Sequence, residues 1–296
     1  MHVAVTVVLV LVACFLEAFG DVVQHRALAK MPNARVGGGG ILRAFGNVEF
    51  LAGLGLFCVG AAVHVSAIAL GGSVIIVQTL AISLLVWVLV LAVAIEHVRL
   101  GLADYAGSAL VVGGLVLFVV VLGTPSNPAD AVNYGGWVLA IVIVVLVSAM
   151  LILISANVGS GPAAALAGTA AGFMAALFFT LVSVVFTILR LDGIGGAFAN
   201  WVLYATLVVG AAAIVVQTIA FKAGPVTASV PPLVVFNPAL STILGLTLLG
   251  ETVHETPLDL VLIAVAWGLM IVGIVFLSRS DIIAAEFANP EDAEIL

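Results

Sequence analysis

The chain has 296 residues, of which 64% are hydrophobic and only 8% are charged, and its mean hydropathy is +1.39. A soluble domain is about 45–50% apolar and about 25% charged, and a single core stops growing at roughly 250–300 residues. Lipid must therefore be the main solvent, which excludes soluble enzymes, disulfide scaffolds and disordered proteins. The net charge of −7 also argues against a nucleic-acid partner.

Nine stretches are long and apolar enough to cross about 30 Å of hydrocarbon as helices. They are expected at residues 3–24, 48–70, 73–95, 101–123, 135–157, 163–189, 200–222, 226–250 and 257–279. Runs such as Val138–Leu153 do not alternate polar and apolar residues, as the strands of a membrane barrel would. The predicted fold is therefore an all-α, multi-pass protein of the cytoplasmic membrane, with membrane lipid as its surroundings.

The basic residues predict the orientation of these helices, because cytoplasmic loops are enriched in Lys and Arg. With the N-terminus outside, seven of the eight basic residues fall on the inner side and only Arg190 falls outside. Four of the seven lie in the first inner loop, residues 25–47. The prediction is an N-out, C-in chain whose acidic tail, residues 280–296, is cytoplasmic.

An internal repeat divides the chain. Glu96 and Asp104 follow the third predicted helix, and Glu251 and Asp259 follow the eighth with the same spacing. Residues 64–71 also resemble residues 217–224. We expect a first repeat at 1–134 with helices one to four, an extra connecting helix at 135–157, and a second repeat at 163–279 with helices six to nine.

The second repeat should be upside down, because one repeat and the connecting helix together make five crossings. Many secondary transporters are built from inverted repeats, with the substrate site near the midplane between them. A duplicated helical bundle that transports nothing is the alternative.

Several segments resemble the drug/metabolite transporter superfamily, in its EamA-type and NIPA-like branches as they occur in actinobacteria. The matching segments are residues 211–225 (AAAIVVQTIAFKAGP), Ala228-Ser-Val-Pro231, Asn237-Pro238, Gly250-Glu251, Gln24-His25-Arg26-Ala27 and Ser73-Val-Ile-Ile-Val-Gln78-Thr79. The resemblance covers nearly the whole chain. It implies a secondary carrier or facilitator for metabolites or, in the NIPA-like branch, for magnesium. Members of the superfamily usually have ten helices, and the nine predicted here fit the NIPA-like branch better.

Glu17 and Asp21 share one face of the first helix, and Gln24 extends the same stripe. Glu17 should lie roughly 10 Å deep at 1.5 Å per residue, where a carboxylate must be protonated, paired or next to water. Two carboxylates this close disfavour each other's ionised form, which suits a proton-coupled switch. The same pair could hold Mg²⁺, which prefers oxygen ligands. Alternatively, Asp21 only reaches the interface.

Other polar residues are expected within the membrane. His64, Gln78 and the repeat-related Gln217 are placed at matched depths from the two surfaces, where they would line a pathway or bond to neighbouring helices. Asn237 is expected near the midplane, in an eighth helix that Pro231, Pro232 and Pro238 should break. A proline kink that only shapes packing is the alternative.

Several conspicuous features predict structure rather than chemistry. Cys14 and Cys58 should pack as small hydrophobic residues. Gly168 and Gly172 form a helix-packing face, and whether two copies dimerise through it is left open. The acidic and histidine residues at 251–259 should belong to a solvated loop and to the cap formed by Thr256, Pro257 and Asp259.

These patterns together predict a secondary transporter of a small metabolite or polar-headed compound, with proton coupling through Glu17. The predicted pathway residues are Glu17, Asp21, Gln24, His64, Gln78, Gln217 and Asn237. No enzyme motif is present, and no catalytic residue or cofactor is expected. The alternatives are a NIPA-like Mg²⁺ transporter, with Glu17 and Asp21 as the metal ligands, and a non-transporting scaffold or accessory subunit.

Overall fold

The computed structural model describes residues 3–29, 46–91, 93–94, 100–122, 132–223, 226–251 and 256–278. The regular elements in these residues are helices, with no strand among them, which confirms the all-α prediction. The elements are α1 (Val3–Ala29), α3 (Val48–Ala69), α4 (Val74–Leu80), the 3₁₀-helix η1 (Ala81–Ser83), α5 (Leu84–Leu91), α6 (Leu102–Leu122), α7 (Tyr134–Ser155), α8 (Ser160–Ala199), α9 (Trp201–Ala223), α10 (Val226–Leu248) and α11 (Pro257–Ser278).

Each predicted crossing coincides with helix in the structure, and α4, η1 and α5 together occupy the third. Within the described residues, seven helical segments are long and apolar enough to cross a membrane. The other two crossings, α1 and α9, contribute the shorter apolar runs Ala4–Gly20 and Trp201–Gln217. The chain is thus a helical, multi-pass membrane protein, while the count of nine crossings and their orientation remain predictions.

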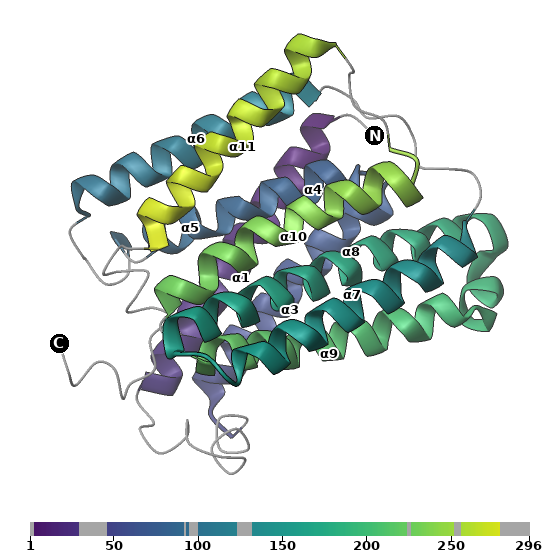
Figure 1. Ribbon diagram of the computed structural model, residues 1–296, viewed down its shortest axis with the longest axis horizontal. Helices are drawn as coiled ribbons and strands as arrows, with labels where there is room; N and C mark the ends of the chain where they lie inside the picture. The colour runs from purple at the N-terminus through teal and green to yellow at the C-terminus, as the bar shows by residue number, and fades with distance from the viewer. Residues whose placement is uncertain are drawn as a thin grey trace.

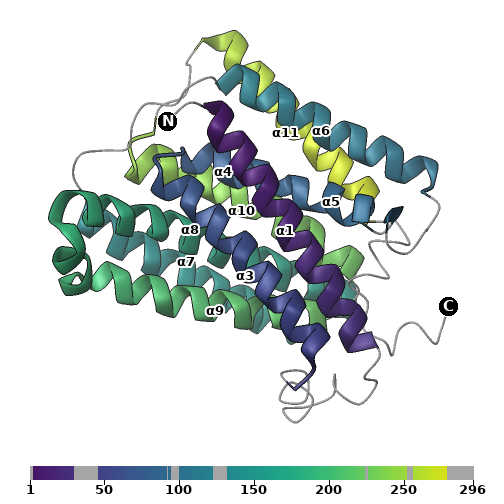
Figure 2. The same cartoon turned by 180° about the vertical axis from the view of Figure 1, so that it is seen from behind.

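The helices form a bundle with two distinct edges (Figure 1). The helices α6 and α11 lie side by side along one edge, and α7, α8 and α9 lie together along the other. The view from behind shows α1 and α3 packed against each other across the middle (Figure 2). Both views place α4 and α10 between the edges, where they contact each other.

The centre of the bundle is the segment α4–η1–α5. All seven residues of α4 are buried, including the polar Gln78 and Thr79. A helix that is apolar on nearly every side is one that other helices surround. Its regular hydrogen bonding changes at Ala81–Ser83, where the chain makes a short 3₁₀ turn. Such a turn within a longer helix often marks a hinge or a functional site.

The prediction of a broken helix around Asn237 is wrong. The helix α10 runs continuously from Val226 to Leu248, although Pro231, Pro232 and Pro238 lie inside it. Proline is tolerated in a membrane helix when neighbouring helices stabilise the freed backbone groups. Here α8 packs closely along α10. The interruption lies instead in α4–η1–α5, the helix of the first half that corresponds to α10 in the expected repeat.

Two glycines explain how closely α8 approaches α10. A Cβ atom on Gly168 would collide with the Ser229 carbonyl oxygen, and one on Gly172 would lie 2.7 Å from the Leu233 carbonyl oxygen. The predicted helix-packing face therefore exists, and it is occupied within the chain. The helix itself extends beyond the predicted 163–189, with a kink at Gly193, where φ is 69°.

Side chains cap several of the helices. The Asn47 and Asn133 carboxamides accept hydrogen bonds from backbone N–H groups at the starts of α3 and α7. At the start of α11, the Thr256 hydroxyl accepts from the Asp259 N–H at 3.2 Å and also bonds to the Asp259 carboxylate. This confirms the predicted cap at 256–259 and fixes where α11 begins.

Candidate functional site

The crossing of α1 and α3 depends on glycine at the contact. A Cβ atom on Gly60 would lie 2.8 Å from both the backbone nitrogen and the Cγ atom of Glu17. A Cβ atom on Gly20 would lie 2.6 Å from the backbone nitrogen of Phe57. The two backbones therefore approach as closely as glycine permits, as small residues allow in membrane bundles.

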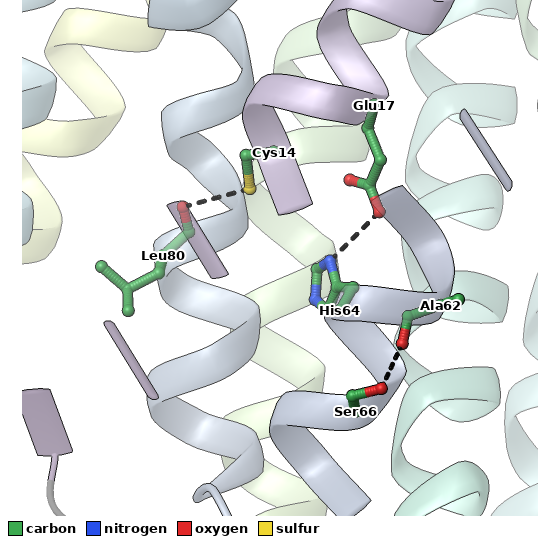
Figure 3. Close-up of polar contacts among 6 residues, drawn as sticks. All are labelled: Cys14, Glu17, Ala62, His64, Ser66 and Leu80. Carbon is green, nitrogen blue, oxygen red and sulfur yellow. Dashed lines mark hydrogen bonds and ion pairs between the residues drawn. The ribbon is translucent and has the colours of Figure 1, made fainter. Parts of the chain in front are cut away.

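This close crossing brings the predicted residues Glu17 and His64 together. Oε1 of Glu17 lies 3.4 Å from Nδ1 of His64, and the two side chains point toward each other (Figure 3). Glu17 is 7% exposed and His64 is 2% exposed. A carboxylate inside a membrane protein requires a partner, and the imidazole supplies it.

A third helix holds the imidazole from its other side. The ring of His64 stacks on that of Phe179 of α8, with the centroids 4.9 Å apart and the planes 20° from parallel. Neither ring nitrogen has a hydrogen bond to the described residues. The ring is thus positioned by its stacking on Phe179 and by its contact with Glu17, and neither ring nitrogen is committed to a hydrogen bond with the described residues.

Cys14 completes the cluster, although its sequence context predicted only packing as a small hydrophobic residue. Its thiol lies next to Leu80, 4.0 Å from the carbonyl oxygen, which is a weak contact (Figure 3). One possible ligand atom each from Cys14, Glu17 and His64 lies within 4.8 Å of the others, and all three residues are buried. The spacing of three between Cys14 and Glu17, which puts both on one helix face, is the signal that could have revealed it.

A second group of buried polar side chains lies on α4, η1 and α10. These side chains have a buried polar atom without a hydrogen-bond partner among the described residues; they belong to Gln78, Thr79, Ser83, Asn237 and Ser241. In a dry interior each unmade hydrogen bond costs about 1–3 kcal/mol. This concentration of unpaired polar atoms favours a site where a polar ligand or water supplies the missing hydrogen bonds.

The packing of α4 on α10 sets the register of this group, which we term the polar seam. A Cβ atom on Gly245 would lie 3.0 Å from Cγ1 of Ile75, so the start of α4 meets the end of α10. Gln78 follows Ile75 by three residues and Ser241 precedes Gly245 by four, so each lies about one helical turn from this contact. Gln78 and Asn237, both predicted pathway residues, thus belong to the same pair of helices.

The other predicted pathway residues lie elsewhere. Gln217 of α9 is exposed on the outside of the bundle, and the structure brings it to neither group. Asp21 and Gln24 lie on α1, but their side chains fall outside the described part of the chain. Whether Asp21 joins Glu17 in a pathway remains a prediction.

Glu251 is not the solvated loop residue that the sequence suggested. Its side chain is buried and accepts hydrogen bonds from the Ser73 hydroxyl and from the N–H groups of Val74 and Ile75, at 2.9, 2.6 and 3.1 Å. Glu251 therefore caps α4 across the bundle. Burial raises the pKa of its carboxyl, and the three hydrogen bonds oppose that shift. His254 and Glu255 lie outside the described residues.

Comparison with known proteins finds that the chain is similar in sequence to an uncharacterised protein. It is 24% identical over 271 residues to an uncharacterised protein of Corynebacterium glutamicum, and the alignment covers 90% of this chain and 92% of that protein. No family model matches the chain. No solved structure matches it either.

Proposed function

We propose that the protein is a secondary transporter that moves a small metabolite or polar-headed compound across the cytoplasmic membrane, with proton coupling through Glu17. The observation that carries this proposal is the buried pair of Glu17 and His64, 3.4 Å apart in a bundle of lipid-facing helices. Ionisable groups inside a membrane protein are costly and commonly belong to proton relays and substrate pathways. A carboxylate beside an imidazole can exchange a proton without creating an unpaired buried charge.

The polar seam supports a route for a polar substrate. Gln78 and Thr79 are fully buried in α4, and Asn237 and Ser241 lie on the helix that packs against it. A substrate with hydroxyl, amide or similar groups would satisfy these side chains, whereas an apolar substrate would leave them unpaired. The seam thus favours a hydrogen-bonding substrate.

The helix contacts are also those that the proposed inverted repeat would produce. The first and second helices of each half pack together, α1 with α3 and α8 with α9. The third helices, α4 and α10, meet each other, and so do the fourth helices, α6 and α11. Asp104 and Asp259 each lie near the start of the fourth helix, where Asp104 accepts from the Gly101 N–H and Asp259 bonds to Thr256.

The test compares metabolites inside and outside cells that produce wild-type protein or the variant Glu17→Gln. We expect wild type to shift at least one polar metabolite across the membrane and Glu17→Gln to lose that shift at equal protein levels. Proteoliposomes with a trapped pH-sensitive dye then measure coupling. Adding that metabolite should change the internal pH when the vesicles contain wild type, but not when they contain Glu17→Gln. Asp192→Asn, which changes an exposed carboxylate, is the matched control. Full transport by Glu17→Gln would exclude the carboxylate mechanism.

The two alternatives make different predictions in the same experiment. A magnesium carrier would show stabilisation by millimolar Mg²⁺ that Glu17→Gln with Asp21→Asn removes. A scaffold would show neither transport nor stabilisation, and would copurify with a partner at a fixed stoichiometry. Among the described residues, the groups beside Glu17 are an imidazole and a thiol, and a sulfur donor favours the metabolite carrier over the magnesium carrier.

A further inference from the structure

Three different metal-binding side chains meet between α1 and α3. Cys14 is fully buried, and Glu17 and His64 are nearly so. One ligand atom of each lies within 4.8 Å of the other two. We propose that Cys14, Glu17 and His64 bind one divalent transition-metal ion of the Zn²⁺ class. The proposal rests on these three side chains and does not depend on transport.

The donor atoms decide which ion fits. A thiolate, an imidazole and a carboxylate are the ligands that proteins use for Zn²⁺. Mg²⁺ takes oxygen ligands in an octahedron and retains several waters. A sulfur donor in a buried cluster is therefore unsuited to Mg²⁺ and favours a softer ion.

The spacing is close to that of a metal site. Ligand atoms about 2.1 Å from a tetrahedral Zn²⁺ are about 3.4 Å from one another. The Glu17 Oε1 and His64 Nδ1 atoms are already 3.4 Å apart. The three ligand atoms lie within 4.8 Å of one another, so a movement of about 1 Å would close the triangle, and the contact of the Cys14 thiol with the Leu80 carbonyl at 4.0 Å offers little resistance.

The charges also balance. A thiolate and a carboxylate together carry two negative charges, which neutralise a divalent cation, while the imidazole binds as a neutral ligand. Burying a neutral cluster avoids the desolvation penalty that an isolated ion would incur inside a membrane protein. The three residues therefore suit a 2+ ion without further charged partners.

Within the described residues three side chains would bind the ion, which leaves the fourth position of a tetrahedral ion to water or another ligand. Structural zinc sites use four protein ligands, whereas sites with an exchangeable fourth ligand use three. The site is thus suited to an ion that exchanges or holds a small ligand, rather than to one that only staples two helices.

The experiment titrates the purified full-length protein with Zn²⁺ buffered by a chromophoric chelator. Wild type should bind one Zn²⁺ per chain and unfold at a higher temperature in its presence, and Mg²⁺ should cause no shift. Cys14→Ala and His64→Gln should each weaken binding by more than the roughly 10–100-fold that loss of an outer-shell partner costs. Cys58→Ala, which changes an exposed cysteine on α3, is the matched control and should bind as wild type does.

Co²⁺ provides a second measurement that does not depend on stability. Bound to wild type, it should show thiolate-to-metal charge-transfer absorption, and Cys14→Ala should lose this absorption while eluting as wild type does on gel filtration. Absence of Zn²⁺ binding by wild type, or equal binding by Cys14→Ala, would overturn the proposal. If Glu17→Gln transports fully while wild type binds Zn²⁺, the transport mechanism fails and the metal site stands.

Discussion

The Glu251 carboxylate accepts a 2.6 Å hydrogen bond from the backbone N–H of Val74, a residue 177 positions earlier in the chain. The same carboxylate binds the Ile75 N–H and the Ser73 hydroxyl, so it caps the first turn of α4. Gly250, with φ of 68°, makes the turn that directs Glu251 back into the bundle. One side chain thus joins the end of α10 to the start of the central helix.

Glu251→Ala should therefore destabilise the protein. The buried N–H groups of Val74 and Ile75 would lose their acceptor, which costs about 2–3 kcal/mol in the free energy of unfolding. The measurement is chemical or thermal unfolding in detergent. Asp192→Ala removes an exposed carboxylate and should leave stability nearly unchanged. Equal stability of both variants would show that the cap contributes nothing.

The same residue predicts a pH dependence. Because burial raises the pKa of Glu251 above its ordinary value of 4.5, its stabilising contribution is fully present below pH 4.5 and is lost as pH rises through the raised pKa. Glu251→Gln cannot titrate at this position. The melting temperature of wild type minus that of Glu251→Gln should thus fall as pH rises above 4.5. A difference that stays constant with pH would contradict the shift.

Gly60 offers a test of how α3 positions the site. Gly60→Ala places a Cβ atom 2.8 Å from the backbone nitrogen of Glu17, so the two helices must separate and Glu17 must move away from His64. We expect loss of transport in the metabolite assay and weaker Zn²⁺ binding. Gly55→Ala, in the same helix, meets no atom within 4 Å and should change neither. Normal behaviour of Gly60→Ala would mean that the crossing tolerates a wider separation.

Two adjacent glycines of α6 test the pairing of α6 with α11. A Cβ atom on Gly114 would lie 2.6 Å from Cγ of Met270 and 2.8 Å from the Ala266 carbonyl oxygen, whereas one on Gly113 would meet nothing within 4 Å. Gly114→Ala should lower the melting temperature in detergent. Gly113→Ala should leave it unchanged or raise it, because alanine favours helix by roughly 0.5–1 kcal/mol. A lower melting temperature for Gly113→Ala than for Gly114→Ala would show that the packed face of α6 includes Gly113 rather than Gly114.

A double-mutant cycle tests whether Glu17 and His64 act as a pair. Removing either partner leaves the other buried without its polar partner, so Glu17→Gln and His64→Gln should each reduce stability and transport. If the two residues act together, the double variant should be little worse than either single variant. Additive losses in both measurements would show that the two side chains act independently.

Composition and periodicity determined the helices of this protein. A chain that is 64% hydrophobic must use lipid as its solvent, and only backbone hydrogen bonds within each segment satisfy the peptide groups there. The sequence therefore predicted α3, α6, α7 and α11 to within about two residues at each end. It also predicted the cap at Thr256, because a capping box is a local pattern.

The site was only partly predictable. Glu17 and His64 were conspicuous because a charged or titratable group inside a membrane helix is costly, but nothing local stated that they meet. The sequence around Cys14 predicts a core residue, since a buried thiol and a metal ligand have the same sequence signature. The burial of Glu251 was not predictable from local sequence because its hydrogen-bond partners are 176 to 178 positions away.

Tertiary structure decided which faces of the helices meet. The proline residues of α10 predicted a broken helix from local chemistry, yet packing against α8 keeps it continuous, and the irregular turn lies in α4–η1–α5. Gly60 permits the close approach that joins Glu17 to His64. Gln217, which the sequence repeat matches to His64, lies exposed. The sequence determined that lipid surrounds the helices, through the local cost of exposing apolar or peptide groups. Contacts between distant residues determined where the few polar groups gather.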